Sequence, residues 1–123
     1  NYFEKFSRNE SWLIQRRPNS SYIDAWFVKL KKGGYQDPHI HPLGWLSGVI
    51  YLKTVTDLVG KEGAIEFGVA GGHYKKALET YPWKTFKPQK GDIVIFPSSL
   101  YHRTVPINKF EERCAVAFDL RPI

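Results

Sequence analysis

Two histidines, one residue apart and just before an apolar run, constrain the fold of this chain most strongly. His39 and His41 open the stretch, a loop containing Pro42 and Gly44 follows, and residues 44–52 have the composition of a buried strand. Because side chains alternate faces in an extended segment, the two imidazoles point the same way and can converge on one ion. Imidazole binds Zn, Fe, Cu and Ni, so the pair predicts a metal site without naming the metal.

A third histidine supports this interpretation. His102 comes shortly after the predicted strand 93–96 and its preceding turn, 88–92. Two close histidines, a long gap and a distant third are the layout of a metal site inside a β-barrel. His73, in a glycine-rich loop, is interpreted as an ordinary surface residue because a lone histidine is seldom a ligand.

Short extended segments separated by turn residues recur along the chain. They are rich in β-branched and aromatic residues and predict strands or short extended pieces at 22–30, 35–41, 44–52, 63–68, 93–96 and 113–120. Tyr2, Phe6 and Leu13 are at rough helical spacing, so a short helix or an irregular segment is expected within residues 1–17. The sequence therefore predicts an all-β sandwich or barrel.

Length, charge and cysteine content narrow the class of protein. The 123 residues suit one domain, 1–123. The net charge of +6 comes from basic residues that are dispersed along the chain, so no nucleic-acid partner is expected. No apolar run approaches the ~18 residues of a membrane span, so no membrane partner is expected either. The one cysteine, Cys114, excludes an intrachain disulfide and favours a cytoplasmic location. A homodimer is one option for the oligomeric state.

The last predicted strand has two different faces. Arg113, Ala115, Ala117 and Asp119 share one face, and the other is apolar and is predicted to be core: Cys114, Val116, Phe118 and Leu120. Small residues beside a guanidinium would leave room for a ligand, and a guanidinium can hold a carboxylate through two parallel hydrogen bonds. The alternative is that Arg113 is a strand-edge charge next to Glu111 and Glu112.

Several motifs, in order, resemble the 2-oxoglutarate/Fe(II)-dependent oxygenases. The closest branch is the bacterial and phage one, which is often fused to tetratricopeptide repeats, and the resemblance runs from about Trp26 to Leu120. The motifs that carry it are His39-x-His41-Pro42-x-Gly44-Trp45-Leu46-Ser47, Tyr51-Leu52, Gly91-Asp92-x-Val94-x-Phe96-Pro97-Ser98, His102, Val105-Pro106, Glu112-Arg113 and Ala117-Phe118-Asp119. The resemblance implies a double-stranded β-helix, a cupin-like jelly roll that encloses Fe(II) and 2-oxoglutarate.

The resemblance also implies an activity: a non-haem dioxygenase couples decarboxylation of 2-oxoglutarate to oxidation by O2 of a small-molecule or peptide substrate. By the resemblance, His39 and His102 bind the metal, and Arg113 and Tyr51 bind the far carboxylate of 2-oxoglutarate. His41 stands where the wider superfamily has a carboxylate, so the predicted set is His39, His41 and His102. Asp37 shares their parity and could instead be the third ligand or accept a hydrogen bond behind one.

Two other classes of function compete with the oxygenase. A cupin-type metal enzyme has the same fold and a similar His-x-His motif, but it usually carries a glutamate a few residues later, and residues 42–46 contain none. Arg113 also has no role in the cupin scheme. A metal-free jelly roll acting as an interaction module is the third class, and three histidines with a strand arginine disfavour it. Trp26, Trp45 and Tyr101 are candidate walls of a substrate pocket, or ordinary core residues.

Overall fold

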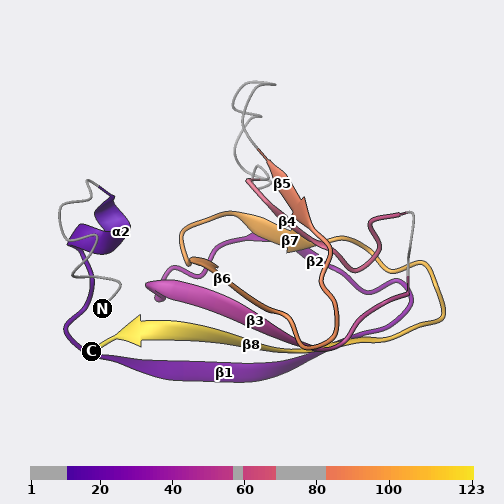
Figure 1. Cartoon of the computed structure of the whole chain (residues 1–123), viewed down its shortest axis with the longest axis horizontal. Coiled ribbons are helices and arrows are strands. Elements are labelled where there is room, and N and C mark those ends of the chain that lie inside the picture. The colour runs from indigo at the N-terminus through magenta and orange to yellow at the C-terminus, as the bar shows by residue number, and fades with distance from the viewer. Residues whose placement is uncertain (1–10, 57–59, 69–82) are drawn as a thin grey trace.

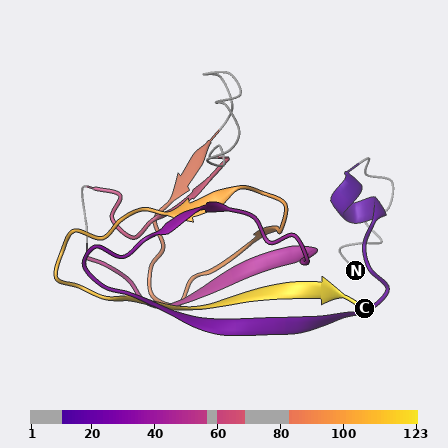
Figure 2. The ribbon, with the colours of Figure 1, turned by 180° about the vertical axis from the view of Figure 1, so that it is seen from behind.

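The protein is a sandwich of two antiparallel β-sheets that face each other, as Figure 1 and the reverse view in Figure 2 show. A computed structural model describes residues 11–56, 60–68 and 83–123. Within them lie the short helix α2 (Trp12–Gln15) and eight strands, β1 (Ser21–Leu30), β2 (Gln36–His39), β3 (Leu46–Lys53), β4 (Ile65–Phe67), β5 (Lys84–Phe86), β6 (Ile93–Pro97), β7 (His102–Thr104) and β8 (Arg113–Pro122). The all-β jelly-roll prediction is confirmed.

Successive strands belong to different sheets, except that β4 and β5 are neighbours in one sheet. One has the strand order β1-β8-β3-β6 and the other β2-β7-β4-β5, and every pair of neighbours is antiparallel. Strand β8 lies centrally in the first sheet, between the ten-residue strand β1 and strand β3. The inner face of β8 therefore looks across the sandwich at β2 and β7, the strands that carry His39 and His102.

Most of the predicted strands are present, with two additions. Strands β1, β2, β3, β4, β6 and β8 overlap the predicted segments, whereas β5 and β7 have only three residues each and were not predicted. Helix α2 matches the end of the expected N-terminal helical segment, but Tyr2 and Phe6 lie outside the described residues, as does His73. The indole of Trp45 donates a 3.0 Å hydrogen bond to the carbonyl of Leu13 and ties α2 to the sandwich.

The prediction that the apolar face of β8 is the core was wrong. Arg113, Ala115, Ala117 and Asp119 are the buried residues, at most 8% exposed, and their neighbours on the other face are only half-buried. The space between the sheets holds hydrogen-bond partners for the carboxylate of Asp119 and the ring of Tyr51 against the guanidinium of Arg113. The outer face of this sheet remains apolar, with Ile23, Phe27, Ile93 and Ile95 each more than half exposed; these residues belong to the strands β1 and β6.

One glycine has a clear conformational role in joining the strands. Gly91 has a φ of +94°, in the left-handed region that side chains with a Cβ rarely adopt, and its backbone N–H donates a 2.7 Å hydrogen bond to the carbonyl of Tyr51. The predicted turn at 88–92 is therefore built as expected, and it starts β6 beside the end of β3.

The described residues also include no membrane-spanning candidate: none of their helices has the length and apolar character to cross a bilayer.

Candidate functional site

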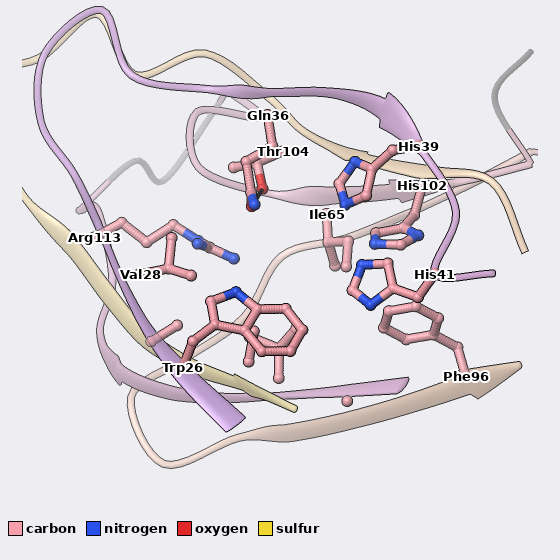
Figure 3. Close-up of a pocket in the computed structure, with 14 residues that line it drawn as sticks. Trp26, Val28, Gln36, His39, His41, Ile65, Phe96, His102, Thr104 and Arg113 are labelled. Carbon is pink, nitrogen blue, oxygen red and sulfur yellow. Dashed lines mark hydrogen bonds between the residues drawn. The ribbon is translucent and has the colours of Figure 1, made fainter. Parts of the chain in front are cut away.

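The three histidines predicted from the sequence meet between the two sheets (Figure 3). The antiparallel pairing of β2 with β7 places His39 directly opposite His102, and their ring centroids are 4.3 Å apart. His41, two residues beyond His39, stacks on it with centroids 5.2 Å apart and an interplanar angle of 19°. Each residue offers one nitrogen, and the three nitrogens all lie within 4.8 Å of one another. The shared face expected for the pair is thus formed.

A hydrogen bond behind each ring fixes its orientation. Nδ1 of His39 donates to the carbonyl of Asp37 at 2.6 Å, and Nδ1 of His102 donates to the carbonyl of Leu100 at 2.9 Å. Nδ1 of His41 bonds the carboxylate of Asp119 at 2.6 Å. With Nδ1 carrying the proton, Nε2 of each ring keeps its lone pair, which is the tautomer that a metal ligand needs.

The carboxylate behind His41 is itself held by buried hydroxyls. Oδ1 of Asp119 accepts a second hydrogen bond from Oγ of Ser47 at 2.7 Å, and that hydroxyl is 2.8 Å from the hydroxyl of Ser98. Asp119, Ser47 and Ser98 are each at most 3% exposed. A Cβ on Gly44 would overlap the Ser98 hydroxyl, so a larger residue in the loop after His41 would displace that hydroxyl. Sequence reasoning quoted these residues only as family motifs and missed their joint role, because they come from distant segments.

The environment keeps His102 neutral. Burial lowers the pKa of His102 to about 4, and the neighbouring imidazoles of His39 and His41 act in the same direction. A neutral imidazole is the form that binds a metal, so His102 is ready to act as a ligand at ordinary pH.

Asp37 has a different place from the one considered in the sequence. Its side chain is exposed, and it is the backbone carbonyl of Asp37 that accepts the hydrogen bond from His39. The carboxylate that approaches the histidines is Asp119, 78 residues from His41 in the sequence.

Arg113 is buried across the interior from the histidines. Its side chain is 2% exposed, and its guanidinium carbon lies 4.8 Å from the ring centroid of Tyr51, which is fully buried. Burial raises the pKa of Tyr51, and the charge of Arg113 opposes that rise. Within the described part of the chain, Nε of Arg113 and the hydroxyl of Tyr51 have no hydrogen-bond partner. Asp119 shares a face of β8 with Arg113, but its carboxylate bonds His41 and Ser47.

A cavity connects the histidines to Arg113 (Figure 3). Its lining combines the three imidazoles and Arg113 with Trp26, Gln36, Thr104 and seven apolar residues or glycine: Val28, Gly48, Val49, Ile65, Phe96, Ala115 and Ala117. Trp26 is therefore a wall of the cavity, as expected, whereas Trp45 and Tyr101 do not line it; nor does Tyr51, which packs against Arg113. Among the described lining residues there is no carboxylate.

These residues fit a divalent metal and an anionic cosubstrate. Three imidazoles with their Nδ1 atoms already bonded form a donor set for Fe(II), Zn or Ni, although not the more usual set of two histidines and one carboxylate. A buried guanidinium with an unpaired N–H requires an anion in the cavity, because an uncompensated buried charge costs several kcal/mol. The far carboxylate of 2-oxoglutarate would supply that anion.

Comparisons with known proteins agree with this chemistry. Residues 24–119 match the model of a family described as "Putative 2OG-Fe(II) oxygenase". No curated protein sequence matches the chain. The motifs singled out in the sequence, from Trp26 to Leu120, fall almost wholly inside the matched region.

Solved structures share the fold at low sequence identity. A prolyl-4-hydroxylase from Pseudomonas putida superposes with a TM-score of 0.65 at 18% identity, over 82% of this chain and 53% of that one. HygX from Streptomyces hygroscopicus, solved with nickel, 2-oxoglutarate and hygromycin B bound, superposes with a TM-score of 0.60 at 12% identity, over 98% of this chain and 64% of that one. An RmlC-like cupin from Desulfovibrio desulfuricans superposes with a TM-score of 0.52 at 12% identity, over 85% of this chain and 77% of that one.

The likeness to these structures establishes the jelly-roll fold. This chain spans about half the length of the prolyl-4-hydroxylase. The family follows from the sequence match, which covers residues 24–119 and so more than half of the chain. The chain belongs to the 2-oxoglutarate/Fe(II)-dependent oxygenase family.

Proposed function

We propose that this chain is a single catalytic domain, residues 1–123, of a non-haem Fe(II)/2-oxoglutarate-dependent dioxygenase. In this proposal His39, His41 and His102 bind Fe(II), and Arg113 binds the far carboxylate of 2-oxoglutarate. The observation that carries it is the pairing of two features across one cavity: three imidazoles whose Nδ1 atoms are all bonded from behind, and a buried guanidinium with an unpaired N–H.

When bound, Fe(II), 2-oxoglutarate and O2 supply an oxidation of the substrate that releases succinate and CO2. The chain's own residues prepare the site for that chemistry. The Asp37 and Leu100 carbonyls and the Asp119 carboxylate aim the three imidazoles inward. The apolar lining, which includes Val28 and Phe96, limits the access of water between metal and Arg113.

Tyr51 supports Arg113 in this proposal. Its ring packs on the guanidinium, and its unpaired hydroxyl is a donor available to the same carboxylate if Arg113 shifts on binding.

The His41–Asp119 pair compensates for the missing carboxylate ligand, because the negative charge of Asp119 lies 2.6 Å behind an imidazole ligand.

The remaining expectations are part of the proposal. The substrate is a small molecule or a peptide, and the location is cytoplasmic, which the single cysteine favours. The absence of nucleic-acid and membrane partners, the option of a homodimer and the kinship with the bacterial and phage branch stay predictions.

One alternative is supported by a specific observation. A cupin-type metal enzyme would share the fold, and a purely histidine donor set suits such a site as well. The two functions differ in what they require of Arg113, because only the oxygenase uses it to bind a cosubstrate.

The test is a turnover assay with the purified protein. Incubation with Fe(II), 2-oxoglutarate and O2 should form succinate, measured by NMR, even without the primary substrate, at a slow uncoupled rate. The His102→Ala variant should form none, because it removes one metal ligand. Absence of succinate from a parent protein that binds one metal ion per chain would contradict the oxygenase and favour the cupin.

A further inference from the structure

A hydrogen-bonded pair of neutral side chains lines the cavity between the histidines and Arg113. Gln36 of β2 lies directly opposite Thr104 of β7, and the Thr104 hydroxyl donates a 3.0 Å hydrogen bond to Oε1 of Gln36. Thr104 is 3% exposed. Figure 3 shows the pair on one side of the space between Arg113 and the three imidazoles, with Trp26 on the opposite side.

The pair determines what the cavity wall offers to a ligand. Because the oxygen of the Gln36 amide already accepts from Thr104, the part of that amide left for the cavity is its NH2 group, a donor. Apart from the imidazoles, the described lining side chains that can form hydrogen bonds are Gln36, Thr104, Trp26 and Arg113. Indole and guanidinium are donors only, so this part of the wall presents mainly donors and is complementary to an anion.

We propose that Gln36 binds the cosubstrate by donating its amide N–H to an oxygen of 2-oxoglutarate, and that Thr104 is a positioning residue that holds the Gln36 amide in the donating orientation. This inference rests on the proposed function. Gln36 would give 2-oxoglutarate a second, uncharged contact in addition to Arg113. This role also explains why the buried hydroxyl of Thr104 bonds a glutamine side chain rather than a backbone group. A hydrogen bond from a neutral donor to a carboxylate is stronger than one between two neutral groups.

The experiment is calorimetric titration of 2-oxoglutarate into the Mn(II)-loaded protein without O2, with Mn(II) affinity measured in parallel. Gln36→Leu removes the donors and should weaken 2-oxoglutarate binding about 10- to 100-fold. Gln36→Glu keeps the shape and the bond from Thr104 but replaces the donor by an anion, so it should weaken binding at least as much. Mn(II) affinity should stay within about twofold of the parent in both variants.

Thr104 is tested by a pair of substitutions. Thr104→Val keeps the volume but loses the hydroxyl, and it should weaken 2-oxoglutarate binding about three- to tenfold, whereas Thr104→Ser keeps the hydroxyl and should restore it. The matched control is Thr85→Val on β5 of the same sheet, because the Thr85 hydroxyl donates to Glu66 and does not line the cavity. That variant should bind 2-oxoglutarate like the parent.

The outcomes separate this inference from the proposed function. If the parent binds 2-oxoglutarate and Arg113→Ala weakens it, but both Gln36 variants stay within twofold of the parent, the role of Gln36 is refuted and the proposed function stands. Equal losses in Thr104→Ser and Thr104→Val would refute the role of the Thr104 hydroxyl. A Mn(II)-loaded parent that binds no 2-oxoglutarate would overturn both proposals.

Discussion

The carboxylate of Asp119 offers the sharpest test of the proposal that the chain binds a metal through three histidines. The substitution Asp119→Asn keeps the size of the side chain and an acceptor oxygen for His41 and Ser47, but it removes the negative charge. The carboxylate is 3% exposed and accepts both hydrogen bonds on one oxygen, at 2.6 and 2.7 Å, so solvent screens this charge little.

The expected loss follows from the strength of those bonds. A charge-assisted hydrogen bond is about twice as strong as a neutral one, so replacing it should cost about 1–2 kcal/mol of metal binding, a factor of roughly 5–30. The substitution of a group that supports a metal ligand from behind typically costs about 10–100-fold, in agreement with that range. Asp119→Ala should cost more, because it leaves the buried Nδ1–H of His41 and the hydroxyl of Ser47 without their acceptor.

The assay is competition of the apo variants against a chelator of known affinity for Mn(II) and Zn(II). The matched control is Asp24→Asn: Asp24 lies directly opposite Asp119 on the neighbouring strand β1, but its carboxylate pairs with Arg121 at 2.7 Å and is partly exposed. The control should bind metal like the parent. If Asp119→Asn also stayed within twofold of the parent, Asp119 would not tune the metal site, and the account of a three-histidine site supported by a carboxylate would be refuted.

Three further predictions concern other parts of the site. Arg113→Ala should weaken 2-oxoglutarate binding by about 2–5 kcal/mol, or roughly 30- to 4,000-fold in affinity measured by calorimetry. Arg113→Lys should also bind 2-oxoglutarate weakly, because an ammonium cannot make two parallel hydrogen bonds. Unchanged affinity in both variants would contradict the role of Arg113 in binding 2-oxoglutarate. The apoprotein should lose stability as the pH falls from ~6.5 to about 4, because in this window His102 binds a proton in the unfolded chain but not in the folded one. Urea titrations should show a decrease in the free energy of unfolding of up to about 3 kcal/mol. A His102→Gln variant should not show this decrease. Gly44→Ala should lower the free energy of unfolding by about 1–3 kcal/mol, because its Cβ would displace the hydroxyl of Ser98; a thermal melt equal to that of the parent would refute this packing argument.

The metal-site pattern was predictable because it is local. The shared face of His39 and His41 follows from the alternation of side chains in an extended segment, and the long strands β1, β3 and β8 have compositions that identify them as strands. His102 and Arg113 were candidates from their own local patterns, and the resemblance to a family gave them their expected roles. Asp119 lies behind His41 because the two sheets pack face to face, and Gln36 lies opposite Thr104 because β2 pairs with β7. These contacts join residues 78 and 68 positions apart, which a single sequence does not show.

The face of β8 was assigned wrongly for a physical reason. The face with Phe118 is apolar and was taken as core, whereas the face with Arg113 was expected to leave room for a ligand. In the structure, Asp119 has its hydrogen-bond partners inside and Arg113 packs on Tyr51, so the charged face can be buried. Strands β5 and β7 were missed because each has three residues that are mostly polar, whereas β4, equally short, has the apolar residues Ile65 and Phe67.

The most direct test of the central claim is a calorimetric titration of 2-oxoglutarate into the protein with and without one equivalent of Mn(II), in the absence of O2. The account predicts one metal ion per chain, held by His39, His41 and His102, and one 2-oxoglutarate that binds measurably only when the metal is present. It also predicts that Arg113→Ala abolishes or greatly weakens the second event and leaves the first unchanged. Binding of Mn(II) with no metal-dependent binding of 2-oxoglutarate would contradict it.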